Sequence, residues 1–383
     1  MTSPSQIATQ TRAIAMWDFS WLERRWNGGG FHDWEAALDG LVERGYDVVR
    51  IDVYPHLIAA DPERSWDLIP VWPQHHWGSP SLLSVRPLPA LLEFLTLAKD
   101  RGILVSLSSW FREDSENVRL GLNTPRKLAE VWNTTLRHIQ EAGLLDTVWF
   151  VDLCNEWMQS AWAPFVFHAE STHALSISRT SKQYERWTSE ALEGVREKFD
   201  LPLCFSFSDQ FDDCLQEDVS GFDLLEPHIW MAQESADQFY ATLEYDLNNS
   251  NFDAHQYKIL ENAQALYEAD TVRWQTQLAQ KIDAMAEWST STQLPLVTSE
   301  GWAVVTWKDS PNLDWTWIKD LNAFAVDRAL RHHRWIAIAT SNFCSPQFTG
   351  MWDDIPWHRE MTTKIRSSTP DIGLPALTPL LKA

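Results

Sequence analysis

Apolar and amphipathic runs alternate along the whole chain. Short runs of β-branched and aromatic residues predict strands, and longer runs with apolar positions three and four apart predict helices. In the first helical run, Trp34, Leu38 and Leu41 fall on one face. The predicted strands cover residues 13–19, 47–53, 103–108, 147–153, 203–207, 224–229, 296–299 and 335–340.

A helical run follows each of these strands. The predicted helices cover residues 32–44, 89–100, 125–141, 181–199, 211–216, 260–288, 315–332 and 357–365. Thr124 suits an N-cap and Pro125 a first helical position. Eight strand–helix units in order predict an α/β fold, a single (β/α)8 TIM barrel over residues 1–383, with an irregular Pro-rich tail at 367–383.

A doubly wound sheet is the alternative fold. It would normally carry a glycine-rich phosphate turn directly after the first strand. Gly28, Gly29 and Gly30 lie well past that strand and lack the fingerprint spacing. We therefore interpret them as a loop and favour the barrel.

Three connections after predicted strands are long and rich in aromatic residues. They cover residues 55–87, 158–180 and 231–259, after strands two, four and six. Loops of this length in a compact domain usually serve function. Above one barrel mouth they would close an open cleft into a pocket that accepts a chain end.

Composition and charge limit the classes of molecule that this protein can bind. The net charge of −22 repels phosphate backbones and anionic membrane surfaces, so we expect neither nucleic acid nor membrane as a partner. No run reaches the roughly 18 apolar residues of a membrane span. The N-terminus lacks a basic segment followed by an apolar one, and the four cysteines are far apart. This pattern predicts reduced thiols and a cytoplasmic location, while the oligomeric state stays open.

The carboxyl ends of the strands carry the candidate chemistry, because barrel active sites lie there. Glu156 and Glu300 each follow an apolar run, where a carboxylate is not expected unless the strand ends there and places it in a site. Cleaving a glycosidic bond needs two carboxyl groups, one to protonate the leaving oxygen and one to support the anomeric carbon. Each glutamate could instead be a helix N-terminal carboxylate favoured by the helix dipole.

No metal or other cofactor is expected. His168 and His173 are five positions apart, so they do not share a helical face as metal-binding pairs do. The adjacent pair His332–His333 cannot converge on one ion. The expected partner is therefore a carbohydrate alone.

The ordered motifs resemble the clan A retaining glycoside hydrolases, closest to family 5 cellulases and cellulase-like proteins. In that clan an Asn-Glu pair ends the fourth strand and supplies the acid/base, and a glutamate ending the seventh strand is the nucleophile. Asn155-Glu156 and Glu300 occupy these places. The resemblance implies that Glu156 carries the proton and that Glu300 attacks the sugar.

Two further positions match the clan in order. Arg50 ends the second strand, as the clan arginine does, and His228 matches the sixth-strand histidine. A structural arginine paired with Asp52 or Asp18, and a buried structural histidine, are the alternatives. Trp230 stands where the clan has a tyrosine, which removes a hydroxyl that would contact the nucleophile.

Other positions depart from the clan. Ser108, Ser109 and Trp110 stand at the third strand, where the clan has a histidine, and the eighth-strand tryptophan is either replaced by Phe343 or supplied by Trp352. These changes affect the part of the site that reads the sugar. The full set of predicted sugar-binding residues is Arg50, Asn155, His228, Trp230, Trp302, Trp352, Asp18 and Trp110.

The sequence thus predicts a retaining β-glycoside hydrolase, exo-acting on short β-linked oligosaccharides or glycosides. A barrel that binds sugar without cleaving it is the alternative from a different class. A transglycosylase would use the same residues. Which sugar and linkage are recognised stays open.

Overall fold

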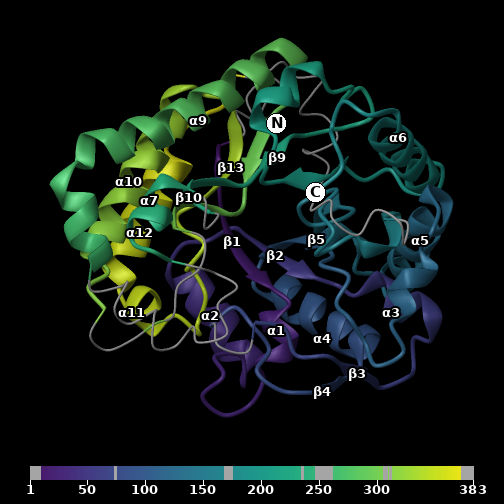
Figure 1. The fold of residues 1–383 in the computed structure, drawn as a ribbon. Helices are drawn as coiled ribbons and strands as arrows, with labels where there is room; N and C mark the ends of the chain where they lie inside the picture. Colours follow the sequence, from purple (N-terminus) through teal and green to yellow (C-terminus); the bar gives the residue numbers. More distant parts are fainter. Residues whose placement is uncertain are drawn as a thin grey trace, which may run out of the picture.

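The computed structural model describes residues 10–72, 76–167, 176–233, 237–245, 262–304, 309 and 313–371. In Figure 1 the strands gather around a central axis and the longer helices form a ring outside them. The predicted (β/α)8 barrel is confirmed. Counting around the barrel, its strands are β1 (Arg12–Asp18), β2 (Val48–Asp52), β5 (Leu104–Ser108), β6 (Val148–Asp152), β7 with β8 (Leu203–Cys204, Ser206–Phe207), β9 with β10 (Glu226–Pro227, Ile229–Ala232), β11 with β12 (Leu296–Thr298, Gly301–Val304) and β13 (Trp335–Ala339).

Parallel pairing closes the barrel. One sheet runs in the order β11-β13-β1-β2-β5-β6-β7, with the first and last barrel strands paired through β1 and β13. The remaining gap is closed by the short ladders β8–β9 and β10–β12 and by a parallel bridge between Leu225 and Leu296. Because every strand of a parallel barrel points the same way, the ends of β6 and β11 open onto one mouth.

Helices cover the outside of this barrel, and short helices occupy the connections. The helices are α1 (Ser20–Glu23), α2 (Trp34–Glu43), α3 (Pro55–Ala60), α4 (Pro87–Asp100), α5 (Pro125–Glu141), α6 (Lys182–Arg196), α7 (Gln238–Thr242), α9 (Thr271–Thr292), α10 (Thr316–Arg331), α11 (Thr349–Trp352) and α12 (Ile355–Arg366). Short 3-10 helices lie at Val118–Gly121, Leu145–Thr147, Pro164–Val166 and Phe211–Gln216. None of the described helices is both long and apolar enough to cross a membrane.

Side-chain caps fix where several helices begin. The hydroxyl of Thr124 accepts from the backbone N–H of Lys127 at the start of α5, as the sequence predicted. The helix predicted over residues 260–288 is broken in two: residues 262–269 are helical, and Asp270 then caps a new helix, α9. Capping by a short acidic side chain interrupts a run that apolar periodicity alone treats as continuous.

The long connection after β2 has structure of its own. It contains α3 and an antiparallel hairpin of β3 (Trp66–Leu68) and β4 (Leu83–Val85). Parts of all three predicted long loops lie outside the described residues, at 73–75, 168–175, 234–236 and 246–261. The pocket that those loops were expected to form therefore stays a prediction.

Tryptophan supplies much of the core. Among the most deeply buried side chains are Trp17, Trp21, Trp132, Trp157, Trp230, Trp274, Trp288, Trp302 and Trp335. All four cysteines are buried free thiols, as predicted. The polar exception is the barrel centre near its mouth, where buried arginine, histidine and carboxylate side chains meet.

Candidate active site

The turn after β6 presents Glu156 at the barrel mouth. Glu156 has φ of 47°, a left-handed conformation that is uncommon outside glycine and turns the chain sharply. Its N–H donates to the Ser206 hydroxyl at 3.0 Å, and the N–H of Trp157 donates to the Ser206 carbonyl at 2.8 Å. The neighbouring fifth strand therefore fixes the backbone that carries this carboxyl group.

The seventh strand presents Glu300 just after β11. The Ile229 N–H donates to the Glu300 carbonyl at 3.2 Å, which links this residue to the sixth strand. A Cβ at Gly301 would lie 3.0 Å from the Ile229 carbonyl oxygen, closer than side chains normally approach. Glycine at 301 thus allows the close strand contact that fixes Glu300.

His228 lies between the two glutamates. Its Nδ1 is 3.2 Å from Glu156 Oε1 and 3.6 Å from Glu300 Oε1. One oxygen of each glutamate and a ring nitrogen of His228 all lie within 4.8 Å of one another. The structure therefore brings together the two residues that the sequence predicted as a catalytic pair.

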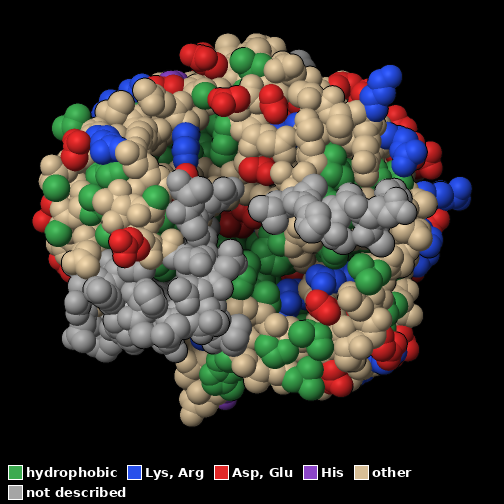
Figure 2. Space-filling view, viewed as in Figure 1, with side chains coloured by type: hydrophobic (Ala, Val, Ile, Leu, Met, Phe, Trp, Pro, Cys, Tyr) green, Lys and Arg blue, Asp and Glu red, His purple; other side chains and the backbone are tan. Residues whose placement is uncertain are grey.

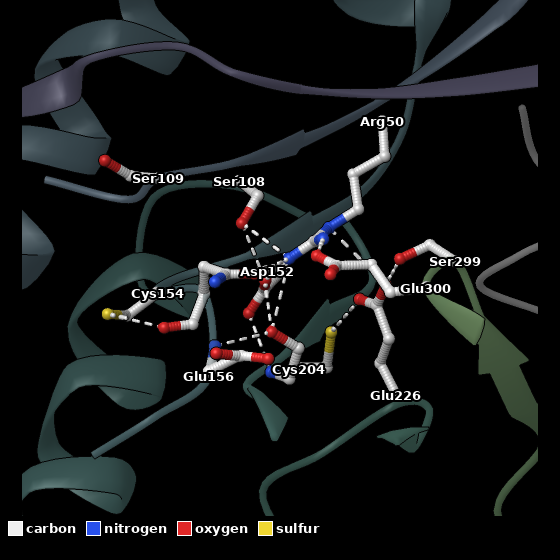
Figure 3. Close-up of polar contacts among 12 residues, drawn as sticks. Arg50, Ser108, Ser109, Asp152, Cys154, Glu156, Cys204, Glu226, Ser299 and Glu300 are labelled. Carbon is white, nitrogen blue, oxygen red and sulfur yellow. Dashed lines mark hydrogen bonds and ion pairs between the residues drawn. The ribbon is translucent and has the colours of Figure 1, made fainter. Parts of the chain in front are cut away.

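Arg50 binds Glu300 directly. Its Nη1 donates to Glu300 Oε1 at 2.8 Å, and its Nη2 donates to Asn155 Oδ1 at 2.8 Å (Figure 3). The guanidinium also lies 4.7 Å from the centre of the Trp110 ring. Arg50, Asn155 and Trp110 are thus all part of this site, although the amide oxygen of Asn155 is committed to Arg50.

Two buried carboxylates that sequence reasoning missed surround Arg50. Asp152 Oδ2 accepts from Arg50 Nη2 at 2.6 Å, and Glu226 Oε1 lies 3.4 Å from Arg50 Nε (Figure 3). The alternative in which Arg50 pairs with Asp52 or Asp18 is wrong. Asp152 lies four residues before Glu156, and Glu226 lies two residues before His228. An acidic residue within each apolar strand was therefore the sequence feature that could have identified both as site residues.

Glu226 is held by several groups at once. The hydroxyl of Ser299 donates to Glu226 Oε1, and the thiol of Cys204 lies 3.7 Å from Oε2 (Figure 3). Its Oε1 also lies 3.9 Å from His228 Nε2. Burial raises the pKa of Glu226 to about 6, against the opposing charge of Arg50.

Burial and charge act in opposition across the site. Burial would lower the pKa of His228, but Glu300 and Glu156 raise it above its usual value. Burial raises the pKa of Glu300, despite the nearby charges of His228 and Arg50. Burial also acts to raise the pKa of Glu156, yet its contacts with His228, Ser208 and Trp162 lower it overall. His228 and the two glutamates therefore titrate as one coupled group, in which the neighbouring carboxylates favour the protonated imidazole.

Asp18 lies at the barrel mouth, but its carboxylate already binds a neighbouring backbone group. It ends β1, and its carboxylate accepts from the Ser20 N–H. Burial raises its pKa well above the usual range, and the charges of Glu23 and Glu300 add to this. Asp18 is thus close enough to Glu300 for their charges to interact.

The predicted tryptophan platforms do not lie open to a sugar. Trp302 is fully buried, and its Nε1 donates to the Ala339 carbonyl at 2.8 Å. Trp352 stacks on the Arg44 guanidinium, 3.9 Å from ring centre to Cζ, against helix α2. Neither ring is exposed in this structure, and the sugar-binding roles of Trp302 and Trp352 stay predictions.

Trp230 is buried too, but it differs in one respect. Its Nε1 has no hydrogen-bond partner among the described residues. Buried indole N–H groups usually find an acceptor. A ligand hydroxyl is the kind of group that could satisfy this donor.

Trp162 is a site residue that the sequence named only as a loop aromatic. It follows β6, and its Nε1 donates to Glu156 Oε2 at 3.2 Å. Figure 2 shows acidic side chains at the bottom of a recess near the centre of this face. No pattern in the sequence singled Trp162 out among twenty-three tryptophans.

Two clusters of the described residues hold metal-ligand atoms close together. One is Glu156, His228 and Glu300, and the other is Asp152, Cys204 and Glu226. The second already pairs with the Arg50 guanidinium, which supplies the positive charge that a cation would bring. His168 and His173 lie outside the described residues.

Comparison with known proteins decides the family. The family model described as "Sugar-binding cellulase-like" matches residues 14–366. The chain belongs to the cellulase-like family. The resemblance to cellulase-like proteins that the strand-end motifs predicted is thereby confirmed.

One solved structure is similar over nearly the whole length of this family member. It is a protein from Parabacteroides distasonis ATCC 8503, itself only provisionally assigned as a glycoside hydrolase. It shares 43% identity, covers 98% of this chain and 100% of its own, and superposes with a TM-score of 0.92.

More distant structures share the fold alone. A GH5_18 protein from Streptomyces cattleya, solved with Manb1-4GlcNAc, has 13% identity, coverage of 93% and 80%, and a TM-score of 0.50. An endo-1,4-beta-D-mannanase from Thermotoga petrophila RKU-1 has 11% identity, coverage of 86% and 87%, and a TM-score of 0.50. A search of curated proteins found no match.

Proposed function

We propose that this protein is a retaining β-glycoside hydrolase with Glu300 as nucleophile and Glu156 as acid/base. The observation that carries the proposal is the glutamate pair around His228, with ligand atoms of all three residues within 4.8 Å of one another. Retaining enzymes hold their carboxyl groups roughly 5–5.5 Å apart, whereas inverting enzymes need roughly 6.5–9.5 Å for an intervening water. The 4.8 Å limit applies to one oxygen of each carboxyl group and lies well below the inverting range, which supports retention.

The contacts divide the two roles. Arg50 donates directly to Glu300 at 2.8 Å and opposes the burial that raises the pKa of this carboxyl group, and so supports the ionised form that a nucleophile requires. Among the described residues, the partners of Glu156 are His228, Trp162 and Ser208, and none of these is an arginine. In the first step Glu300 attacks the anomeric carbon while the leaving oxygen takes a proton from Glu156, and in the second Glu156 activates water.

His228 is the source of the proton that Glu156 needs. Its Nδ1 lies 3.2 Å from Glu156 Oε1, so the imidazolium can pass its proton directly to that oxygen. This leaves a neutral imidazole and a neutral carboxylic acid. A substrate that excludes water favours this neutral pair over two charged groups.

We assign the substrate to short β-linked saccharides or glycosides cleaved from a chain end. Trp230 stands where the clan has a tyrosine, so it has no hydroxyl to offer the nucleophile. Its buried Nε1–H has no partner among the described residues, which supports a role as donor to a sugar hydroxyl. The chain-end preference rests on the long loops. Product analysis on cello- and manno-oligosaccharides tests it, since cutting mainly at internal bonds would exclude an exo-acting site.

The mechanism is tested by trapping the covalent intermediate. A 2-deoxy-2-fluoro-β-glycosyl fluoride of the preferred sugar should label Glu300, as read by peptide mass spectrometry. The Glu156→Gln variant should lose about 10²–10⁴-fold in kcat on substrates with poor leaving groups and far less on a glycosyl fluoride. Labelling elsewhere, or inversion at the anomeric carbon, would contradict the assignment.

The cellulase-like family description also names sugar binding, which keeps a second function in view. A barrel that binds sugar without cleaving it would bind oligosaccharides with no product and no label on Glu300. A transglycosylase would form the label but transfer the sugar to an added acceptor in preference to water. The same trapping experiment, repeated with acceptor sugars, separates all three.

A further inference from the structure

The acid/base Glu156 has two oxygens that face different groups. Oε1 faces His228 and lies on the side of Glu300, while Oε2 accepts the indole N–H of Trp162 at 3.2 Å. The sugar that is attacked must contact Glu300, and the group that leaves must contact Glu156. Trp162 contacts Glu156 through this hydrogen bond, so we expect its ring to lie on the side of the site where the leaving group binds.

Trp162 does not stand alone on that side. The ring of Trp72 meets it edge to face, with centroids 5.2 Å apart and an interplanar angle of 86°. Trp162 is nearly buried at 6% exposure, but Trp72 is 38% exposed. The two rings come from different connections, Trp72 from the one after β2 and Trp162 from the one after β6.

An exposed indole needs explanation in this protein, because nearly all of its described tryptophans are core residues. Among the described residues, only Trp26 and Trp72 of this type are more than a third exposed. Trp26 packs on Arg24 and borders a surface cavity between α1 and α4, so it belongs to another part of the surface. Trp72, in contrast, contacts Trp162, which in turn donates to the acid/base Glu156.

We propose that Trp72 and Trp162 form an aromatic wall for the leaving group, with Trp72 stacking on the first saccharide ring beyond the cleaved bond. The proposal rests on the function proposed above and adds a leaving-group specificity to it. Trp162 supports Trp72 and positions Glu156, and Trp72 supplies the exposed apolar surface. Apolar faces of sugar rings stack on indoles, so the preferred leaving group is a saccharide rather than a small polar alcohol.

The wall predicts a difference between substrates that share a glycone. The test compares cellobiose with methyl β-glucoside, and β-1,4-mannobiose with methyl β-mannoside, using the pair that the wild-type protein cleaves faster. Methanol needs the same proton from Glu156 as a departing sugar does, but it carries no ring to stack. Trp72→Ala should lower kcat/KM for the disaccharide by about ten-fold and change that for the methyl glycoside by less than about two-fold.

Matched variants control for folding and exposure. Trp26→Ala removes an equally exposed indole elsewhere and should change neither substrate. Trp72→Tyr keeps an aromatic face and should retain most of the disaccharide activity, which also covers the case in which the alanine variant folds poorly.

Two results would overturn the wall, one for each of its claims. An equal loss on the disaccharide and the methyl glycoside would mean that Trp72 acts on the glycone or through Glu156 and not by stacking on the leaving sugar. An unchanged disaccharide rate would give Trp72 no binding role. Failure of the proposed function looks different, because the wild-type protein would then cleave neither substrate and take no label on Glu300.

Discussion

The ion cluster around Arg50 makes a quantitative prediction about stability. Arg50 is fully buried and pairs with Asp152, Glu226 and Glu300. Removing one partner of a buried ion pair leaves uncompensated charge and costs about 3–5 kcal/mol. Arg50→Met removes the charge but keeps an unbranched side chain, so the free energy of unfolding at pH 7.5 should fall by about this amount.

The loss should depend on pH in one direction. Burial already raises the pKa of Glu226 to about 6, and removing Arg50 raises it further, together with that of Glu300. An acid with a raised pKa in the folded state loses stability as pH rises above its unfolded value. The cost of Arg50→Met should therefore shrink to about 1–2 kcal/mol at pH 5, where these carboxyl groups take up protons.

Urea unfolding followed by tryptophan fluorescence at pH 5 and 7.5 measures both values. Arg334→Met is the matched control, because Arg334 is also buried but donates to the Ser289 hydroxyl and to backbone carbonyls, not to carboxylates. Its cost should be the same at both pH values. A pH-independent cost for Arg50→Met, equal to that of the control, would refute the charge argument.

Three further predictions concern activity and local packing. The pH profile of kcat/KM should be bell-shaped, with its basic limb above pH 6.5 because neighbouring carboxylates raise the pKa of His228; a limb below that value would exclude His228 as the proton source. Trp162→Phe removes a hydrogen bond that stabilises ionised Glu156, so the pKa of Glu156 should rise and the basic limb of the kcat/KM profile should move to higher pH. A shift of the basic limb to lower pH would contradict this. Gly301→Ala should cost about 1–3 kcal/mol of unfolding free energy through the close strand contact, whereas Gly121→Ala, with open space around its Cβ, should cost little.

The barrel could be predicted because its signals are local. Each strand is a short apolar run and each helix an amphipathic one, so the order of elements follows from periodicity alone. Helix boundaries were less certain where a cap competes with the apolar pattern. Asp270 begins α9 inside a run that periodicity treats as one helix.

The glutamate pair could also be predicted, because two carboxylates at strand ends are costly to place there without use. Its surroundings could not. Trp302 and Trp352 looked like platforms because they sit near strand ends, yet one is core and the other packs on Arg44. Trp162, which does contact Glu156, carries no distinguishing pattern in the sequence.

The sequence by itself determined the strand order, and with it which residues reach the barrel mouth, because every strand of a parallel barrel ends at the same face. Only the tertiary structure decided which of those residues touch. Glu226 and Asp152 lie far apart in the chain, yet both face Arg50. Contacts across a barrel depend on strand stagger and side-chain reach, which no local pattern encodes, and these contacts set the charges on Glu156, His228 and Glu300.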